Sequence, residues 1–254
     1  MTANVWADHS AAFADAYVRE AGTVRFELVT RFLLAHMAKE QRVVDVGGGF
    51  GRQAICLARA GHSVVVLDFD PNMIAIGRKE VAVESPEVQP RVTFVLGRGE
   101  DAVNIVGSGF DLACCHSVLA YQKDPRPLLL STVRAVRQGG LISVLCINKD
   151  AIAMRGGLQG RWKESAASLL AGREMGSQYI PTREYSRGEV SGFLEAGGAR
   201  VEEWQGVGVF TDHLQERLVV QDPEEIYSLE WLAGNRDPYR QVARCFHIIA
   251  RRIE

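Results

Sequence analysis

The sequence lacks a long hydrophobic run, a marked excess of charge and a targeting segment. No stretch of about 18 apolar residues occurs, although a membrane-spanning helix needs at least that many. The amino terminus has no basic segment followed by an apolar one. The net charge of -2 gives no bulk electrostatic reason to expect a nucleic-acid or membrane partner. These absences predict a cytoplasmic protein without a membrane partner.

Paired metal ligands and a disulfide framework are also missing. The cysteines are odd in number, lie inside apolar runs and form no Cys-x-x-Cys pair, so we predict buried thiols in a reducing compartment. None of the six histidines has ligand spacing to another histidine or a cysteine, so no metal site is predicted. The cysteines are Cys56, Cys114, Cys115, Cys146 and Cys245.

The most informative stretch runs from Arg42 to Gly51. Its first half, Arg42-Val43-Val44-Asp45-Val46, is apolar on both faces, as expected of a central strand in a parallel sheet. Four of the next five residues are glycines, and a helical pattern follows. Glycine accepts positive φ, and its bare backbone lets a ligand approach closely. We therefore predict a strand, a glycine turn and a helix, with a ligand above the strand's carboxyl end; a turn without a ligand is the alternative.

The spacing of the glycines argues against one common type of nucleotide site. The dinucleotide fingerprint is Gly-x-Gly-x-x-Gly, but the sixth position counted from Gly47 is Arg52. What fits instead is an acid followed by alternate glycines, Asp45-x-Gly47-x-Gly49-x-Gly51.

Strand patterns alternate with helical patterns through the first half of the chain. This alternation predicts an α/β fold with a doubly wound sheet. Residues 148–185 have no strand pattern and are predicted to form an inserted cap over the active site. The expected strands are 42–46, 63–67, 92–96, 110–115, 141–147, 200–210 and 245–251, with two helices over 5–38, the second of them from Thr23 to Met37, and a capping box at Ser186 and Glu189.

This pattern divides the chain into three regions. Residues 1–40 are expected to be helices that cover the cofactor site, and 148–185 the cap or substrate region. The core is expected to consist of 41–147 and 186–254.

Acidic residues stand where the second and third strands end. Asp68 is suited to accept hydrogen bonds from the vicinal hydroxyls of a ribose, whereas Asp70, directly before Pro71, is better placed as a helix N-cap. Glu100 and Asp101 follow the third strand, where an acid could accept from an adenine amine; a helix-start role for Asp101 is the alternative.

The acid followed by alternate glycines resembles the first motif of the class I S-adenosylmethionine-dependent methyltransferases. The resemblance implies a Rossmann-like fold with a seven-stranded sheet whose last strand is antiparallel, and S-adenosylmethionine as cofactor. Within that family the chain is similar to the bacterial tRNA 5-carboxymethoxyuridine methyltransferases. The matching segments are Gly47-Gly48-Gly49-Phe50-Gly51, Gly61-His62, Cys115-His116-Ser117-Val118-Leu119, Asp124-Pro125-Arg126 and Gly208-Val209-Phe210-Thr211-Asp212.

The resemblance also implies roles for individual residues. Arg25 would hold the cofactor's carboxylate, Asp68 its ribose, and His116 would lie beside the sulfonium. Gly47 and Gly48 would contact the methionine part, and Glu100 and Asp101 would line the adenine. The implied cofactor site comprises Arg25, Asp45, Gly47, Gly48, Gly49, Gly51, Asp68, Phe69, Glu100, Asp101 and His116.

A substrate site is less well defined. His116 is the candidate for a polar catalytic role, as a general base or as a group that orients cofactor or water. Tyr121, Asn148, Arg155, Asp212 and His213 are candidates for orienting the substrate.

Two features depart from the closer group. Gln138 stands where many members have a proline, and residues 149–189 carry seven Lys or Arg against five acids, a mixed surface without a basic run. The leading interpretation is therefore a methyltransferase acting on a small molecule. tRNA carboxyl methylation and a nucleotide-binding Rossmann-like protein without methyl transfer are the alternatives, and the oligomeric state is left open.

Overall fold

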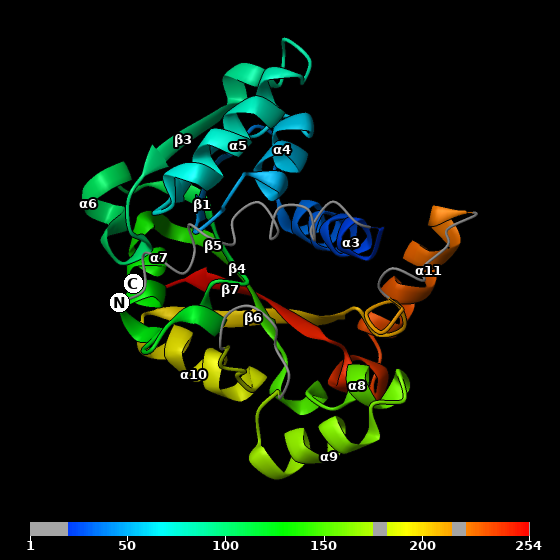
Figure 1. The fold of residues 1–254 in the computed structure, drawn as a ribbon. Helices are drawn as coiled ribbons and strands as arrows, with labels where there is room; N and C mark the ends of the chain where they lie inside the picture. Colours follow the sequence, from blue (N-terminus) through cyan, green and yellow to red (C-terminus); the bar gives the residue numbers. More distant parts are fainter. Residues whose placement is uncertain (1–19, 175–181, 215–221, 254) are drawn as a thin grey trace.

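The computed structural model describes residues 20–174, 182–214 and 222–253, which contain one seven-stranded sheet with helices on both faces (Figure 1). The strand order is β3-β2-β1-β4-β5-β7-β6. β1 to β5 pair in parallel, and β7 is antiparallel to both of its neighbours. This topology confirms the predicted Rossmann-like sheet. The strands are β1 (Arg42–Val46), β2 (Ser63–Asp68), β3 (Val92–Leu96), β4 (Phe110–His116), β5 (Val136–Ile147), β6 (Ala199–Val207) and β7 (Cys245–Arg252).

Helices cover the two faces of the sheet in separate hydrophobic cores. One core packs α3, α4 and α11 against the sheet, and the other packs α6, α7 and α10 against the opposite face (Figure 1). Alternate residues of β1 enter different cores, Val43 one and Val44 the other, which explains why its sequence is apolar throughout. The helices are α3 (Glu20–His36), α4 (Arg52–Arg59), α5 (Pro71–Ala82), α6 (Ala102–Val106), α7 (Arg126–Ala135), α8 (Met154–Leu158), α9 (Trp162–Ala171), α10 (Arg187–Ala196) and α11 (Pro223–Gly234).

Capping residues predicted from the sequence mark the starts of two helices, α5 and α10. Asp70 caps α5 by accepting from the Asn72 backbone N–H at 2.9 Å, with Pro71 in the first turn. At α10 the Ser186 hydroxyl accepts from Glu189 N–H, and the Glu189 carboxylate accepts from Ser186 N–H, which confirms the predicted capping box. α3 confirms the second amino-terminal helix. The first one lies outside the described residues.

The start of the fifth strand was predicted wrongly. β5 begins at Val136, directly after α7, so the paired glycines lie within the strand rather than in a turn before Leu141. The pairing with β4 shifts register between Phe110 and Leu112, and Gly139 has φ +74°. A Cβ on Gly140 would lie 2.9 Å from the Asp111 carbonyl oxygen. The two glycines therefore allow an irregularity within β5. In a sequence pattern, a glycine pair of this kind looks the same as one that ends a helix.

The insert packs beside the β6 and β7 ends of the sheet. Its helices α8 and α9 lie below these strands in Figure 1. The Asn148 side chain accepts from the Asp150 N–H and donates to the carbonyls of Gln241 and Ala243. Asn148 therefore joins the insert to the segment that precedes β7.

The cysteines of the structure can be compared with the prediction of buried thiols. All five cysteines are free thiols, and four of them are buried. Burial raises the pKa of Cys115 to about 12, so that thiol is unreactive at neutral pH. In the described part of the chain, no helix is both long and apolar enough to cross a membrane.

Candidate functional site

A cavity of about 680 Å³ opens at the carboxyl ends of the central strands. Its walls come from the β1–α4 turn, the end of β2, the loop after β3, the end of β4 and one side of α3. β1 lies between β2 and β4 in the sheet, so the chain leaves β1 at the point where the strand order reverses. Open α/β sheets bind their ligands at this switch point, and cavities of roughly 300–1,000 Å³ are typical of small-molecule sites.

The glycines of the turn are needed for two different reasons: Gly49 leaves space for a ligand, and Gly48 and Gly51 leave space for neighbouring side chains. Gly49 has φ +57°, and a Cβ there would meet nothing within 4 Å, so its backbone faces open space. A Cβ on Gly48 would instead lie 2.6 Å from an Asp45 carboxylate oxygen and 2.9 Å from Val66. Gly51 has φ +78° and precedes α4, with Phe94 2.9 Å from its would-be Cβ, and it does not line the cavity. Gly49 is therefore where the turn gives room for a ligand.

Asp68 fastens the end of β2 to the glycine turn. One carboxylate oxygen accepts from the Gly49 backbone N–H at 2.8 Å, and the other accepts from the Asp70 N–H at 2.9 Å. The Phe69 backbone contributes a further hydrogen bond, and since a carboxylate has about four acceptor sites, the group can still accept from a ligand. The side chain lines the cavity and is 7% exposed, and burial raises its pKa although the backbone hydrogen bonds oppose this.

Asp45 gives the cavity a second buried carboxyl group. The residue is 2% exposed, and burial, followed by the charge of Asp68, raises its pKa to about 7. Two carboxyl groups in one wall favour a ligand that carries positive charge nearby.

His116 lines the cavity at the end of β4, and its ring is hydrogen-bonded to a side chain of the neighbouring strand β5. Its Nε2 lies 2.7 Å from the Ser143 hydroxyl oxygen, which lies 2.6 Å from Nε2 of His247. Burial, with a smaller effect of Arg25, lowers the pKa of His116 to about 3, so the ring is neutral at pH 7. Sequence reasoning missed Ser143 and His247. The available signal was a polar residue inside each of two otherwise apolar strands.

The structure brings most of the predicted cofactor residues to this cavity. Arg25, Phe69, Glu100 and Tyr121 line it as well. Asp101 is exposed on the short η2 turn (Gly99–Asp101) and does not line it. The residues that line the cavity and were predicted are Arg25, Asp45, Gly47, Gly48, Gly49, Asp68, Phe69, Glu100, His116 and Tyr121; those missed include Phe26, Arg52, Gln53, Arg98 and Lys123.

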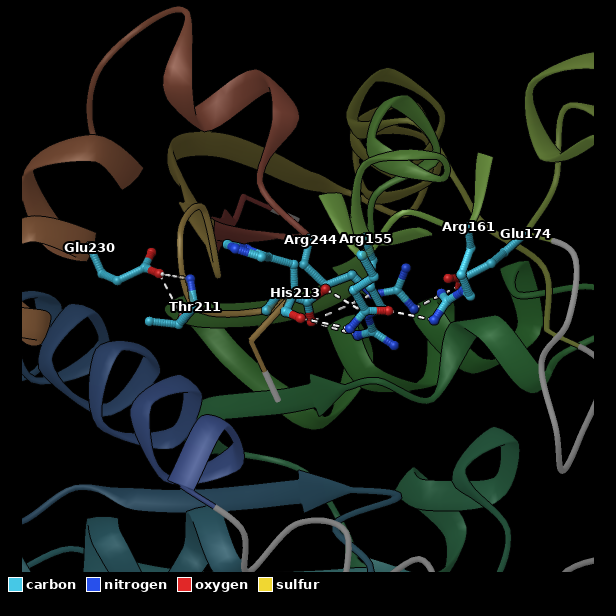
Figure 2. Close-up of polar contacts among 9 residues, drawn as sticks. Arg155, Arg161, Glu174, Thr211, His213, Glu230 and Arg244 are labelled. Atoms are coloured by element: carbon cyan, nitrogen blue, oxygen red, sulfur yellow. Dashed lines mark hydrogen bonds and ion pairs between the residues drawn. The ribbon is translucent and has the colours of Figure 1, made fainter. Parts of the chain in front are cut away.

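Four of the five substrate candidates lie elsewhere. Asn148 is 3% exposed and holds the insert in place. Arg155, Asp212 and His213 line a separate hollow of about 10 Å³, which has room for one water at most. Arg155 donates to both Asp212 oxygens, at 2.7 and 2.5 Å (Figure 2). The structure does not bring these residues together with Tyr121, and their role in orienting a substrate stays a prediction.

The described residues of the insert contribute nothing to the cavity wall. They pack instead against the loop after β6. Gln159 donates to the His213 carbonyl at 2.6 Å, and Arg244 donates to Glu174 at 2.7 Å (Figure 2). Within the part of 148–185 that the structure describes, the segment thus contacts the loop after β6 and forms no part of the cavity wall.

The chain is similar to known proteins along most of its length. A family model described as a methyltransferase domain matches residues 44–144. The tRNA 5-carboxymethoxyuridine methyltransferase of Escherichia coli strain K12 is 30% identical over 224 residues, 87% of this chain and 84% of the relative. The ubiquinone biosynthesis O-methyltransferase of Hydrogenovibrio crunogenus is 25% identical over 148 residues, 58% of each chain.

A solved structure shares the fold. It is a SAM-dependent methyltransferase of Thermotoga maritima, described as a possible histamine N-methyltransferase, which superposes with a TM-score of 0.58 at 17% identity over 99% of both chains. At this identity the likeness concerns the fold alone.

Proposed function

Because this chain belongs to the class I S-adenosylmethionine-dependent methyltransferases, we propose that it transfers a methyl group to the carboxylate of 5-carboxymethoxyuridine in tRNA. The similarity to the E. coli relative supports this acceptor, because it covers 87% of the chain and so extends well beyond residues 44–144. The match to the ubiquinone O-methyltransferase covers only 58% of this chain, so it supports that relative's acceptor less well.

The cavity fits the family's cofactor. When bound, S-adenosylmethionine supplies an activated methyl group on a positively charged sulfur. Asp68 lies in the cavity wall, and Asp45, whose pKa is raised to about 7, adds negative charge there once it is deprotonated, which complements the charge of the sulfonium. Asp68 would accept from the ribose hydroxyls, the bare Gly49 backbone would contact the methionine part, and Glu100 would accept from the adenine amine. Arg25 would pair with the cofactor's carboxylate.

A carboxylate acceptor suits the protonation chemistry of the site. A carboxylate is already deprotonated at neutral pH, so methylation needs no base, whereas a hydroxyl or ammonium must lose a proton. His116, with its pKa lowered to about 3, is a weak base. The chain's own task is then to align the acceptor oxygen with the methyl carbon and to exclude water.

The proposal includes the division of the chain into regions. A cover formed by the amino-terminal residues 1–40 is supported by Arg25, Phe26 and Val29 of α3, which line the cavity. Residues 148–185 would meet the parts of the tRNA that stay outside the cavity. The Arg183 backbone N–H, which donates to the carbonyl of Ala120 beside the cavity-lining Tyr121, supports this role.

The experiment supplies the purified protein with S-adenosylmethionine and tRNA from a strain whose modification stops at the free acid. Nucleoside mass spectrometry is expected to detect the methyl ester. A matched reaction with Asp68→Ala controls for contaminating activity.

A small-molecule acceptor is the second candidate, favoured by the mixed charge of residues 149–189. If tRNA stays unmodified while a metabolite panel yields S-adenosylhomocysteine, the tRNA assignment is wrong and the small-molecule assignment replaces it.

A further inference from the structure

Three polar side chains lie in a row across neighbouring strands β4, β5 and β7. Ser143 Oγ lies 2.7 Å from His116 Nε2 and 2.6 Å from His247 Nε2, so its hydroxyl bridges the two rings. Ser143 and His247 are both 0% exposed, whereas His116 is partly exposed and lines the cavity. The row therefore connects the cavity to the interior of the sheet.

Proton counting leaves two arrangements for this row. The Ser143 hydroxyl has no hydrogen-bond partner among the described residues besides the two rings, so its one proton is donated to one ring and the other ring donates to its oxygen. A neutral imidazole carries one N–H, and burial lowers the pKa of both histidines, so both rings are neutral. Either His247 donates to Ser143, which donates to His116, or every donor in the row is reversed.

The second nitrogen of His247 distinguishes the two arrangements. Nδ1 of His247 is buried and has no hydrogen-bond partner among the described residues. The ring packs against Phe32, with centroids 5.1 Å apart. In the reversed arrangement this nitrogen would carry an N–H with no acceptor, and buried orphan N–H groups are rarer in proteins than buried orphan acceptors. The forward arrangement, with the His247 proton on Nε2, is therefore favoured.

We propose that Ser143 and His247 are positioning residues that fix His116 as the Nδ1–H tautomer, so that His116 presents a hydrogen-bond donor to the cavity. Its Nε2 is occupied by Ser143, and within the described residues its Nδ1 has no protein partner. A donor requires an acceptor on the ligand. We assign to it a carboxylate oxygen of the methyl acceptor, and this assignment, unlike the tautomer, rests on the proposed function.

The tautomer is tested on the protein without any ligand. Long-range ¹H–¹⁵N spectra of histidine-labelled protein report which ring nitrogen carries the proton, and a His116→Asn variant identifies the His116 signals. We expect protonated Nδ1 and bare Nε2. Ser143→Ala, with its fold checked by thermal unfolding, should shift His116 toward a mixture of tautomers. Protonation at Nε2 in the wild type, or no change in Ser143→Ala, overturns the proposal.

The ligand side is tested with two variants of His116 itself. An asparagine amide nitrogen can occupy the place of Nδ1, whereas a glutamine amide reaches toward the place of Nε2. His116→Gln should raise KM for the acceptor about tenfold or more above the value for His116→Asn, because only the asparagine keeps a donor at that place. Any change in the affinity for S-adenosylhomocysteine should be the same in both variants.

The outcomes separate the proposals. Weaker S-adenosylhomocysteine binding in His116→Gln than in His116→Asn would mean that the donor serves the cofactor's carboxylate, which overturns the assignment to the acceptor. Absence of tRNA methylation by the wild type would contradict the proposed function, while the spectra would still decide the tautomer.

Discussion

Asp68 accepts hydrogen bonds from the backbone of neighbouring site residues, and these bonds set what its replacement will do. In Asp68→Asn the amide group would face the N–H of Gly49 or Asp70, donor against donor. We expect the affinity for S-adenosylhomocysteine, measured by calorimetry, to fall by about tenfold to a hundredfold. Asp101→Asn, exposed and outside the cavity, is the matched control and should bind like the wild type. Unchanged binding by Asp68→Asn would remove Asp68 from the cofactor site.

Asp45 makes the stability of the ligand-free protein depend on pH. Burial raises the pKa of Asp45 to about 7, so between pH 4 and 7 the folded state holds a proton that the unfolded chain has released. Stability contributed by this group is therefore lost as the pH rises toward 7. From pH 5 to pH 8 the loss is roughly 2–3 kcal/mol.

Asp45→Asn tests this dependence because the amide does not ionise. The variant should unfold at a temperature similar to the wild type at pH 5 and at a higher temperature at pH 8. Parallel pH profiles for the two proteins would show that the Asp45 carboxyl titrates normally.

At the level of elements, Gly49 is the residue of the β1–α4 turn whose backbone faces open space, so a ligand would contact the turn there. Gly49→Ala places a methyl group in the open space over the turn. The positive φ makes the substitution cost about 1–2 kcal/mol of stability, and S-adenosylhomocysteine should also bind at least tenfold more weakly because its contact surface is blocked.

Gly172→Ala is the matched control for the turn. Gly172 has φ +64°, close to the +57° of Gly49, and its Cβ would also meet nothing within 4 Å, but it ends α9 and lies outside the cavity. It should lose similar stability and keep its affinity. Equal affinity losses in the two variants would indicate a general effect of strain.

At the scale of the whole molecule, buried polar contacts hold the insert against the loop after β6. The Glu230 carboxylate, 1% exposed, accepts from the backbone N–H groups of Val209, Phe210 and Thr211 and so orders this loop. Figure 2 shows its contact with Thr211. Asp212 on the same loop pairs with Arg155 of the insert. The contacts fix the insert against the loop after β6.

Asp212→Asn is expected to lower stability by about 1 kcal/mol, because the partly exposed Arg155 loses its charged partner. Urea unfolding measures the change. Affinity for S-adenosylhomocysteine should stay at the wild-type value, since Asp212 lies outside the cavity. Asp150→Asn, an exposed acid of the same insert, serves as control. A loss of cofactor affinity in Asp212→Asn would contradict a purely structural role.

Patterns along the chain were sufficient to predict the strands β1 to β4 and most of the residues that line the cavity. Strand boundaries from β1 to β4 follow apolar runs that end in polar or glycine residues, and each such end lies at the same edge of a parallel sheet. Residues such as Asp68 and His116 could therefore be assigned to one cavity without coordinates. Gly139 and Gly140 were misjudged because a glycine pair breaks a helix and bends a strand equally well.

The sequence by itself determined the order of strands and helices, the glycine turn and the acid at the end of β2, because these depend on residues close together in the chain. Only the tertiary structure decided that Arg155, Asp212 and His213 lie outside the cavity and that Ser143 and His247 stand behind His116. Those relations join residues up to 104 positions apart. They depend on how β7 inserts between β5 and β6 and on how the insert packs, which local periodicity does not encode.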